Sequence, residues 1–206
     1  IYAADQGNLF GQHGSWGHTI WFSPAHLYDT AMRVPLVVYH PSMKAASRAT
    51  QRLIGQYDIA PTILELAGID SAIENSPGVS FVDSLLAQPH PAAHQAVFFE
   101  QEESRGIRTA RYAYWKRAEG MGEAELYDLQ QDPMQQHNIY AALADSAVVN
   151  ELDAQLAAFF ASYSSPDYNL WTGGVSKGTN PKPMPWIKAY PWPWITKLFS
   201  DWLASQ

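Results

Sequence analysis

The 206-residue sequence contains no cysteine, which excludes a disulfide framework, a thiolate metal site and a cysteine nucleophile. It also lacks any apolar run of about eighteen residues, so no segment reads as a transmembrane helix. Basic residues are few, and the formal net charge is −7. Because phosphate backbones are bound by clustered Lys and Arg, no nucleic-acid partner is expected, and an anionic substrate would need a metal ion or a few placed cations. With 47% hydrophobic and 16% charged residues, the chain is globular.

The N-terminal stretch carries most of the residues that could bind a metal ion or take part in catalysis. An apolar run leads into Asp5-Gln6-Gly7, and a glycine- and histidine-rich loop follows from Asn8 to Pro24. We predict a short helix within His26 to Met32 and a buried strand from Pro35 to Tyr39. Open α/β sheets place ligands where a carboxylate ends a short strand before a glycine-rich loop.

Two interpretations of this stretch stay open on its residues alone. Asp5 and Gln6 offer adjacent oxygen ligands of the kind that a hard cation such as Ca²⁺ prefers, although further ligands would have to come from elsewhere. His13, His18 and His26 lie close in sequence and could bind or protonate an anionic oxygen. They lack the i, i+4 spacing typical of a helical transition-metal site. The alternative is that these residues only serve the turns of a loop.

The clearest helix is predicted from Tyr57 to Ile69, where Asp58 can cap the first amides. Pro61 is tolerated in the first turn, and Gly68 supplies the C-terminal stop. We interpret it as an amphipathic core helix without a catalytic role. The face predicted to be buried comprises Ile59, Ile63 and Leu66.

The region after the prolines near residue 90 predicts strands followed by a packing helix. The strands are expected at 96–101, 105–111, 112–116 and 125–129, the second and third being either one strand or two joined through a bend. Asp145 or Ser146 is then expected to cap the start of a long helix. This order is typical of a small antiparallel α+β layer.

After Pro166 the chain becomes rich in glycine, proline and tryptophan. Dense prolines exclude a helix over most of this tail, but Ile195 to Ala204 could form a short amphipathic one. The tryptophans favour packing onto the body or onto a second copy of the chain over contact with a membrane interface, since only Lys188 and Lys197 flank them.

A series of short segments, taken together and in order, resembles the sulfatase family of the alkaline-phosphatase-like superfamily. The segments are Asp5-Gln6-Gly7, Gly11-Gln12-His13-Gly14, Leu27-Tyr28-Asp29, Arg33-Val34-Pro35-Leu36, Tyr57-Asp58-Ile59-Ala60-Pro61-Thr62, and Glu125-Leu126-Tyr127-Asp128-Leu129 with Asp132-Pro133 and Asn138. The resemblance implies an α/β fold in three parts. Residues 1–93 would be the C-terminal part of the large mixed-sheet catalytic domain, 94–165 a small antiparallel α+β subdomain, and 166–206 a tail.

The resemblance also implies a site. Asp5 and Gln6 occupy the position of the family's Ca²⁺-binding pair, and His13 matches the histidine of its G-x-H-G loop. The lysine that holds the sulfate in the family is absent, and His18, or less favourably His26, is predicted to replace it. The family's formylglycine arises in a C/S-x-P-x-R motif that this sequence lacks, so the nucleophile is expected in an N-terminal portion of a longer protein.

The function implied by the resemblance is sulfuric ester hydrolysis of a small sulfate ester or a sulfated glycan. In that chemistry Ca²⁺ holds the sulfate, the hydrated formylglycine attacks sulfur and a general acid protonates the leaving group; His13 and His18 are the predicted anion or proton partners. The alternatives are a phosphonate or phosphodiester hydrolase of the same superfamily, and a non-catalytic binding module. The resemblance is compatible with a periplasmic or secreted protein, and the sequence does not decide against the cytoplasm.

Overall fold

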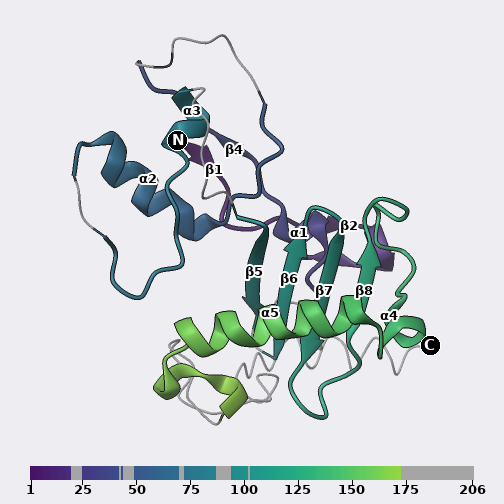
Figure 1. The fold of residues 1–206 in the computed structure, drawn as a ribbon. Coiled ribbons are helices and arrows are strands. Elements are labelled where there is room, and N and C mark those ends of the chain that lie inside the picture. Colours follow the sequence, from purple (N-terminus) through teal and green to yellow (C-terminus); the bar gives the residue numbers. More distant parts are fainter. Residues whose placement is uncertain are drawn as a thin grey trace, which may run out of the picture. The chain divides into compact units, whose positions relative to one another are not determined.

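In a computed structural model of the chain (Figure 1), the described residues are 1–19, 25–41, 43, 49–69, 72–86, 94–101 and 103–172. The chain divides into two compact units, Ile1–Tyr163 and Ser164–Gln206. In the described part of the second unit are two 3₁₀ turns, Pro166–Tyr168 and Leu170–Thr172. The predicted helix at 195–204 lies outside the described residues, as do most of the tail's tryptophans. Among the described residues, no helix has the length and apolarity needed to cross a bilayer.

The centre of the first unit is an antiparallel sheet whose four strands follow chain order. They are β5 (Ala96–Gln101), β6 (Ser104–Thr109), β7 (Tyr112–Arg117) and β8 (Glu125–Asp128). The strand predictions are confirmed, and β6 and β7 are two strands joined by a turn rather than one. The register sets Ile107 opposite both Phe98 and Tyr114, and Tyr114 opposite Leu126. Because side chains alternate along a strand, these residues line one face of the sheet.

Helix α5 (Ala147–Tyr163) covers that face (Figure 1). Its i, i+3 and i+4 spacing places one apolar stripe against the sheet. The helix begins as one of the two predicted caps requires, because the Ser146 hydroxyl oxygen accepts the Val149 amide at 3.3 Å. A short helix, α4 (Tyr140–Leu143), lies beside its start. The core between α5 and the sheet contains Ala96, Ile107, Tyr114, Leu126, Val149, Leu152, Leu156 and Phe160.

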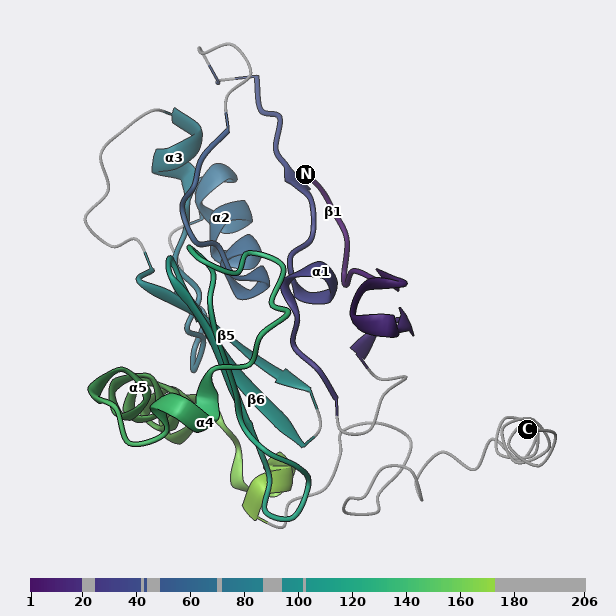
Figure 2. The same cartoon turned by 90° about the vertical axis from the view of Figure 1, so that its right-hand side faces the viewer.

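The opposite face of the sheet contacts a segment from the N-terminal stretch, residues 25–32, which ends in α1 (Asp29–Met32). Figure 2 shows α5 on one side of the sheet and α1 on the other. Leu27 is buried there with Ala113, Trp115 and Tyr127. At the rim, Asp29 pairs with Arg108 at 3.1 Å. The segment thus joins two regions that the sequence assigns to separate domains, and the boundary at residue 93 stays a prediction.

The N-terminal stretch itself forms two small antiparallel pairs. β1 (Tyr2–Ala3) pairs with β4 (Leu36–Val37), and β2 (Leu9–Phe10) pairs with β3 (Trp16–Gly17). The prediction of a loop from Asn8 to Pro24 was therefore wrong at β2 and β3, where glycine turns bring two short strands together. A 3₁₀ turn, Gln12–Gly14, connects them.

The prediction of a buried strand from Pro35 to Tyr39 was also wrong. Only Leu36–Val37 are in a strand, and Val37 and Tyr39 are 59% and 81% exposed. The apolar, β-branched sequence is present, but within the described residues β4 pairs only with β1, and no layer covers it.

Helix α2 (Ile59–Leu66) follows a 3₁₀ turn, Gln56–Asp58, and lies near α3 (Val82–Leu86) on the β5 side of the sheet (Figure 1). Gly68 ends it as predicted: its amide donates to Glu65 and the next amide donates to Leu64, a Schellman arrangement. The predicted buried face was wrong in part, because Ile63 is 49% exposed and Thr62 is the buried residue of the helix.

The role predicted for Asp58 also needs correction. Its side chain makes no capping bond to the amides of α2. The buried carboxylate instead accepts the backbone amides of Gly55 and Val79, both at 2.8 Å, and lies 2.8 Å from His94 Nε2. Asp58 therefore ties α2 to the segments before and after it. This is a structural role.

Candidate functional site

Asp5 and Gln6 lie in an exposed turn directly after β1. The side chain of Gln56 fixes the backbone of this turn, because its Nε2 donates to the carbonyl oxygens of Ala4 at 3.0 Å and Asp5 at 2.9 Å. Asp5 Oδ1 accepts the Gln6 amide at 2.9 Å. The turn that carries the predicted metal pair is thus held by a residue that precedes α2.

The same turn packs closely on α1 through Gly7. The Gly7 amide donates to the Ala31 carbonyl at 2.8 Å. A Cβ atom at this position would lie 2.5 Å from the Thr30 carbonyl oxygen, so only glycine fits. The glycine after the Asp-Gln pair is therefore explained by close approach of two backbones.

The donor set of Asp5 and Gln6 suits a hard cation, since a carboxylate and an amide oxygen are both typical Ca²⁺ ligands. Within the described residues, however, no three His, Asp or Glu side chains are gathered to hold a metal ion. The described part of the chain therefore offers part of a coordination shell, and the remaining ligands would come from elsewhere.

His13 lies at the turn between β2 and β3 and stacks on Tyr28. The two ring centroids are 3.7 Å apart and the planes differ by 2°. The backbone of His13 is left-handed, with φ of 55°, between Gly11 and Gly14, whose φ values are 99° and 68°. The glycines make this tight turn accessible, and the turn carries the imidazole onto the phenol ring.

His26 is buried beside the same tyrosine. Its ring centroid lies 5.0 Å from that of Tyr28, and its residue is 6% exposed. The structure therefore brings together two of the three predicted histidines around one aromatic ring. The partner that unites them, Tyr28, was not among the predicted site residues.

Both of these imidazoles are neutral at neutral pH. Burial lowers the pKa of His13, while the nearby carboxylates of Glu125 and Asp132 act in the opposite direction. Burial, and to a lesser extent proximity to His13, lowers the pKa of His26 to about 4, against the pull of Glu125. A neutral imidazole offers one donor and one acceptor, so His26 would meet an anion through a hydrogen bond and not through a full charge.

His18 directly follows β3 and is half-buried next to the buried Thr19. The described chain resumes at Ala25, whose backbone is clamped by the sheet. The Ala25 amide donates to Glu103 Oε1 at 2.5 Å, and the Ser104 hydroxyl donates to the Ala25 carbonyl at 2.8 Å. Glu103 and Ser104 are themselves buried, so the clamp fixes the chain next to His26.

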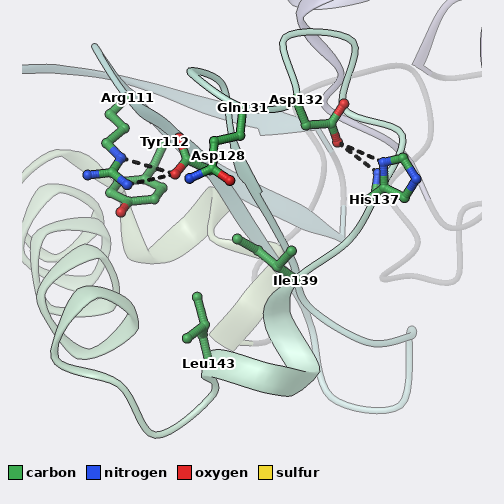
Figure 3. A pocket seen from close by; sticks show the side chains of 8 residues that line it. All are labelled: Arg111, Tyr112, Asp128, Gln131, Asp132, His137, Ile139 and Leu143. Carbon is green, nitrogen blue, oxygen red and sulfur yellow. Dashed lines mark hydrogen bonds and ion pairs between the residues drawn. The ribbon is translucent and has the colours of Figure 1, made fainter.

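A separate pocket of about 470 Å³ opens beside the β6–β7 turn and β8 (Figure 3). Its acidic side chains already bind groups of the protein: Asp128 Oδ2 accepts Arg111 Nη2 at 2.8 Å, and Asp132 Oδ2 accepts the His137 amide at 2.8 Å. The predicted site residues are not among those that line it. We interpret this pocket as part of the framework. The lining residues are Arg111, Tyr112, Asp128, Gln131, Asp132, His137, Ile139 and Leu143.

Sequence reasoning missed the residues that support the histidines from the sheet. Glu125 and Tyr127 alternate along a predicted strand, which signals that they share a face. Nothing in the local pattern signals that this face meets a tyrosine almost a hundred residues earlier. Only the fold brings the two segments together.

Comparison with known proteins gives a family match over most of the chain. A family model described as "N-sulphoglucosamine sulphohydrolase, C-terminal" matches residues 14–161. A curated relative, the N-acetylglucosamine-6-O-sulfatase of Bacteroides thetaiotaomicron, is 26% identical over 155 residues, covering 68% of this chain and 26% of that protein. The chain spans about a quarter to a third of the length of the curated relatives it matches.

The chain is also similar to solved structures. A 2-O GAG sulfatase is similar with a TM-score of 0.68 and 26% identity, covering 80% of this chain and 36% of that one. The phosphonate monoester hydrolase of Agrobacterium radiobacter is similar with a TM-score of 0.66 and 22% identity, covering 81% and 35%. At the lower identity the likeness concerns the fold alone.

Proposed function

Because the chain belongs to the sulfatase family, matching the C-terminal family model over residues 14–161, we propose that it is the C-terminal part of a sulfuric ester hydrolase. That match carries the proposal, since it contains His18, the segment at 25–32 and the sheet behind that segment, while Asp5, Gln6 and His13 lie just before it. The names of the relatives, which include an N-acetylglucosamine-6-O-sulfatase and a 2-O GAG sulfatase, favour a sulfated sugar as substrate class.

In this proposal Asp5 and Gln6 hold a metal ion, for which their oxygen donors and exposed turn are suited. The ion, Ca²⁺ by family resemblance, would neutralise charge on the sulfate group. Gln56 has a supporting role here, because its bonds to Ala4 and Asp5 keep the backbone of the turn in place. The formylglycine nucleophile of the family would come from a part of the protein outside this chain.

His13 and His18 are the proposed partners for the sulfate oxygens and for proton transfer. His13 is neutral at neutral pH, so it can donate one hydrogen bond and accept another. The spacing of the family's lysine falls on Pro24 in this sequence, and His18 is proposed in its place because it follows Gly17 as that lysine often follows a glycine. A histidine there binds an anion as a donor, and as a cation once protonated. We propose His26 as a weaker substrate contact, because it is buried and neutral.

The test is metal analysis and an aryl sulfate assay of the intact protein beside Asp5→Ala and His18→Ala. We expect Asp5→Ala to lose bound calcium and activity together. His18→Ala is expected to keep calcium and raise KM about tenfold or more, and His18→Lys to restore sulfate binding. The matched control is Glu65→Ala, an exposed carboxylate on α2, which should change neither. Calcium content and activity that survive in Asp5→Ala would contradict the metal assignment.

A phosphonate monoester hydrolase is the second candidate, because such an enzyme shares the fold of this chain. The two functions differ in the charge and geometry of the transferred group, which the described residues do not decide. Assaying sulfate, phosphate and phosphonate esters on the same intact protein separates them. A kcat/KM for phosphonate esters that exceeds the value for sulfate esters by tenfold or more would replace the sulfatase proposal.

A further inference from the structure

The sheet face opposite α5 carries a connected set of side chains that ends at the His13 imidazole. The set begins at Glu125, whose two carboxylate oxygens both accept hydrogen bonds. Oε1 accepts Arg117 Nη2 at 2.6 Å, and Oε2 accepts the Tyr127 hydroxyl at 2.5 Å. Arg117 and Glu125 lie on the neighbouring strands β7 and β8, and both side chains are largely buried. The carboxylate is therefore held from two sides by the sheet.

Tyr127 in turn contacts Tyr28. Their ring centroids lie 6.0 Å apart, and the Tyr28 ring also meets Trp115 edge-on at 5.3 Å. Burial raises the pKa of Tyr28, and the nearby charge of Glu125 raises it further. Tyr28 is thus enclosed on the sheet side by two aromatic rings, with its hydroxyl towards the Glu125–Tyr127 pair.

The other side of the Tyr28 ring carries His13, stacked at 3.7 Å. The left-handed backbone of His13 is uncommon for a residue other than glycine, and such a conformation persists where the surroundings fix it. The flat stack on Tyr28 is a contact that can do so, because it fixes the plane of the imidazole ring.

We propose that Glu125, acting through Tyr127 and Tyr28, positions the imidazole of His13 for the reaction. This inference rests on the proposed function, in which His13 serves the sulfate group. The three residues are positioning residues, since they act on the imidazole and not on the substrate. The small C-terminal sheet is then a direct support of the reaction centre.

The charges around His13 come from several elements. Glu125 on β8 and Asp132 in the loop after it both favour the protonated imidazole, while burial opposes protonation. His26, on the segment before α1, interacts with His13 through charge as well. A change at Glu125 or Tyr127 should therefore appear in the titration of His13 even where activity is not measured.

The experiment uses the intact protein and five single variants of it: Tyr127→Phe, Tyr28→Phe, Tyr28→Leu, His13→Gln and the control Tyr114→Phe. Tyr114 is a buried tyrosine on the other face of the same sheet, and its hydroxyl also meets a carboxylate, Asp153 at 3.2 Å. Two quantities are measured: the His13 pKa by NMR, assigned with His13→Gln, and kcat and KM for an aryl sulfate across pH. Circular dichroism reports whether each variant is folded.

Tyr127→Phe is expected to shift the His13 pKa by a few tenths of a unit and to lower kcat about tenfold at nearly constant KM. Tyr28→Leu should have a larger effect, and Tyr28→Phe, which keeps the stacked ring, a smaller one. Tyr114→Phe should leave both quantities unchanged. A His13 titration and kcat that stay at the control values in Tyr127→Phe and in Tyr28→Leu would overturn the proposal.

The catalytic role of His13 and the positioning role of the tyrosines can be refuted separately. If His13→Gln is fully active while Tyr28→Leu still shifts the His13 titration, the catalytic use of His13 is wrong and the positioning contact is real. If His13→Gln is inactive while neither tyrosine variant moves the titration, the function stands and the positioning role is refuted.

Discussion

The two faces of the β5–β8 sheet differ in what they contact and in what holds them. The face towards α5 is covered by a regular helix whose apolar stripe supplies Val149, Leu152, Leu156 and Phe160. The opposite face is covered by an irregular segment, and its contacts are aromatic stacks, a buried ion pair and hydrogen bonds to the backbone of Ala25. The α5 face therefore depends mainly on apolar burial, with Tyr114 and Lys116 meeting Asp153 at its edge, whereas the opposite face adds buried groups that titrate or form directed bonds.

The two faces of the sheet therefore differ in what a substitution is expected to change. Apolar burial is insensitive to pH and tolerates changes of shape as long as volume is kept. Directed contacts fix the orientation of a ring, but they respond to pH and to the loss of single atoms. We expect substitutions on the α5 face to reduce stability alone, and substitutions on the other face to alter His13 and His26.

The largest effect is expected for Leu156→Ala, which removes a fully buried side chain between α5 and the sheet. The loss in free energy of unfolding should be about 2–5 kcal/mol, from lost burial and the cavity left behind. Denaturant unfolding at pH 5 and pH 8 should give the same loss, because no titrating group is involved. Asn150→Ala, at an exposed position of the same helix, is the control. A shifted His13 pKa in Leu156→Ala would show that the faces are coupled.

The second effect is the pH dependence that His26 gives to stability. Its folded pKa of about 4 lies below the ordinary value of 6.5, so the unfolded chain binds the proton first as pH falls. Stability is therefore lost between about pH 6.5 and pH 4, by on the order of 3 kcal/mol. Unfolding of the intact protein and of His26→Gln across this range checks the prediction, because the variant should lose this part of the slope. His137→Gln, an exposed histidine, should keep the slope, and a slope unchanged in His26→Gln would be the contrary result.

The two faces also differ in how far the sequence predicts them. The four strands and α5 follow from alternation and from helical spacing, so their existence, their order and the apolar face come from local pattern. The pairing of Asp5 with Gln6 and the histidine turn were found from residue types and family resemblance. The location of the histidine turn against the sheet was not, because the contacts of Tyr28 with Tyr127 and Trp115 join segments far apart in sequence.

Two of the predictions that the structure corrects failed for a related reason. The strand expected at Pro35 to Tyr39 has the right residues, but a strand is buried only if another layer covers it, and that is not a property of the segment. Asp58 has the right residue type for a helix cap, yet its carboxylate binds the amides of Gly55 and Val79. Local propensity gives the element, and tertiary context decides the partner.

A smaller effect is expected for Glu103→Ala on the histidine side. The substitution removes the acceptor of the Ala25 amide and leaves a buried donor without a bond, which costs about 1–3 kcal/mol. Because Ala25 adjoins His26, we also expect the His26 pKa to rise as water reaches the ring. Denaturant unfolding and NMR titration measure the two consequences. The exposed Glu119→Ala is the control, and a stability loss without any change at His26 would mean that the clamp does not shield the imidazole.

The smallest effect returns to the α5 face, at Ser146→Ala. The hydroxyl oxygen of Ser146 accepts the Val149 amide at the start of α5, and losing such a cap costs about 1 kcal/mol. Ser162→Ala, near the other end of the same helix and exposed, should change stability by only a few tenths of a kcal/mol, since it removes no cap. Amide exchange in the first turn of α5 should rise in Ser146→Ala, with the His13 and His26 titrations unchanged. If those titrations move with the cap, the orientation of the imidazoles depends on the whole layer and not on the Glu125–Tyr127–Tyr28 contacts alone.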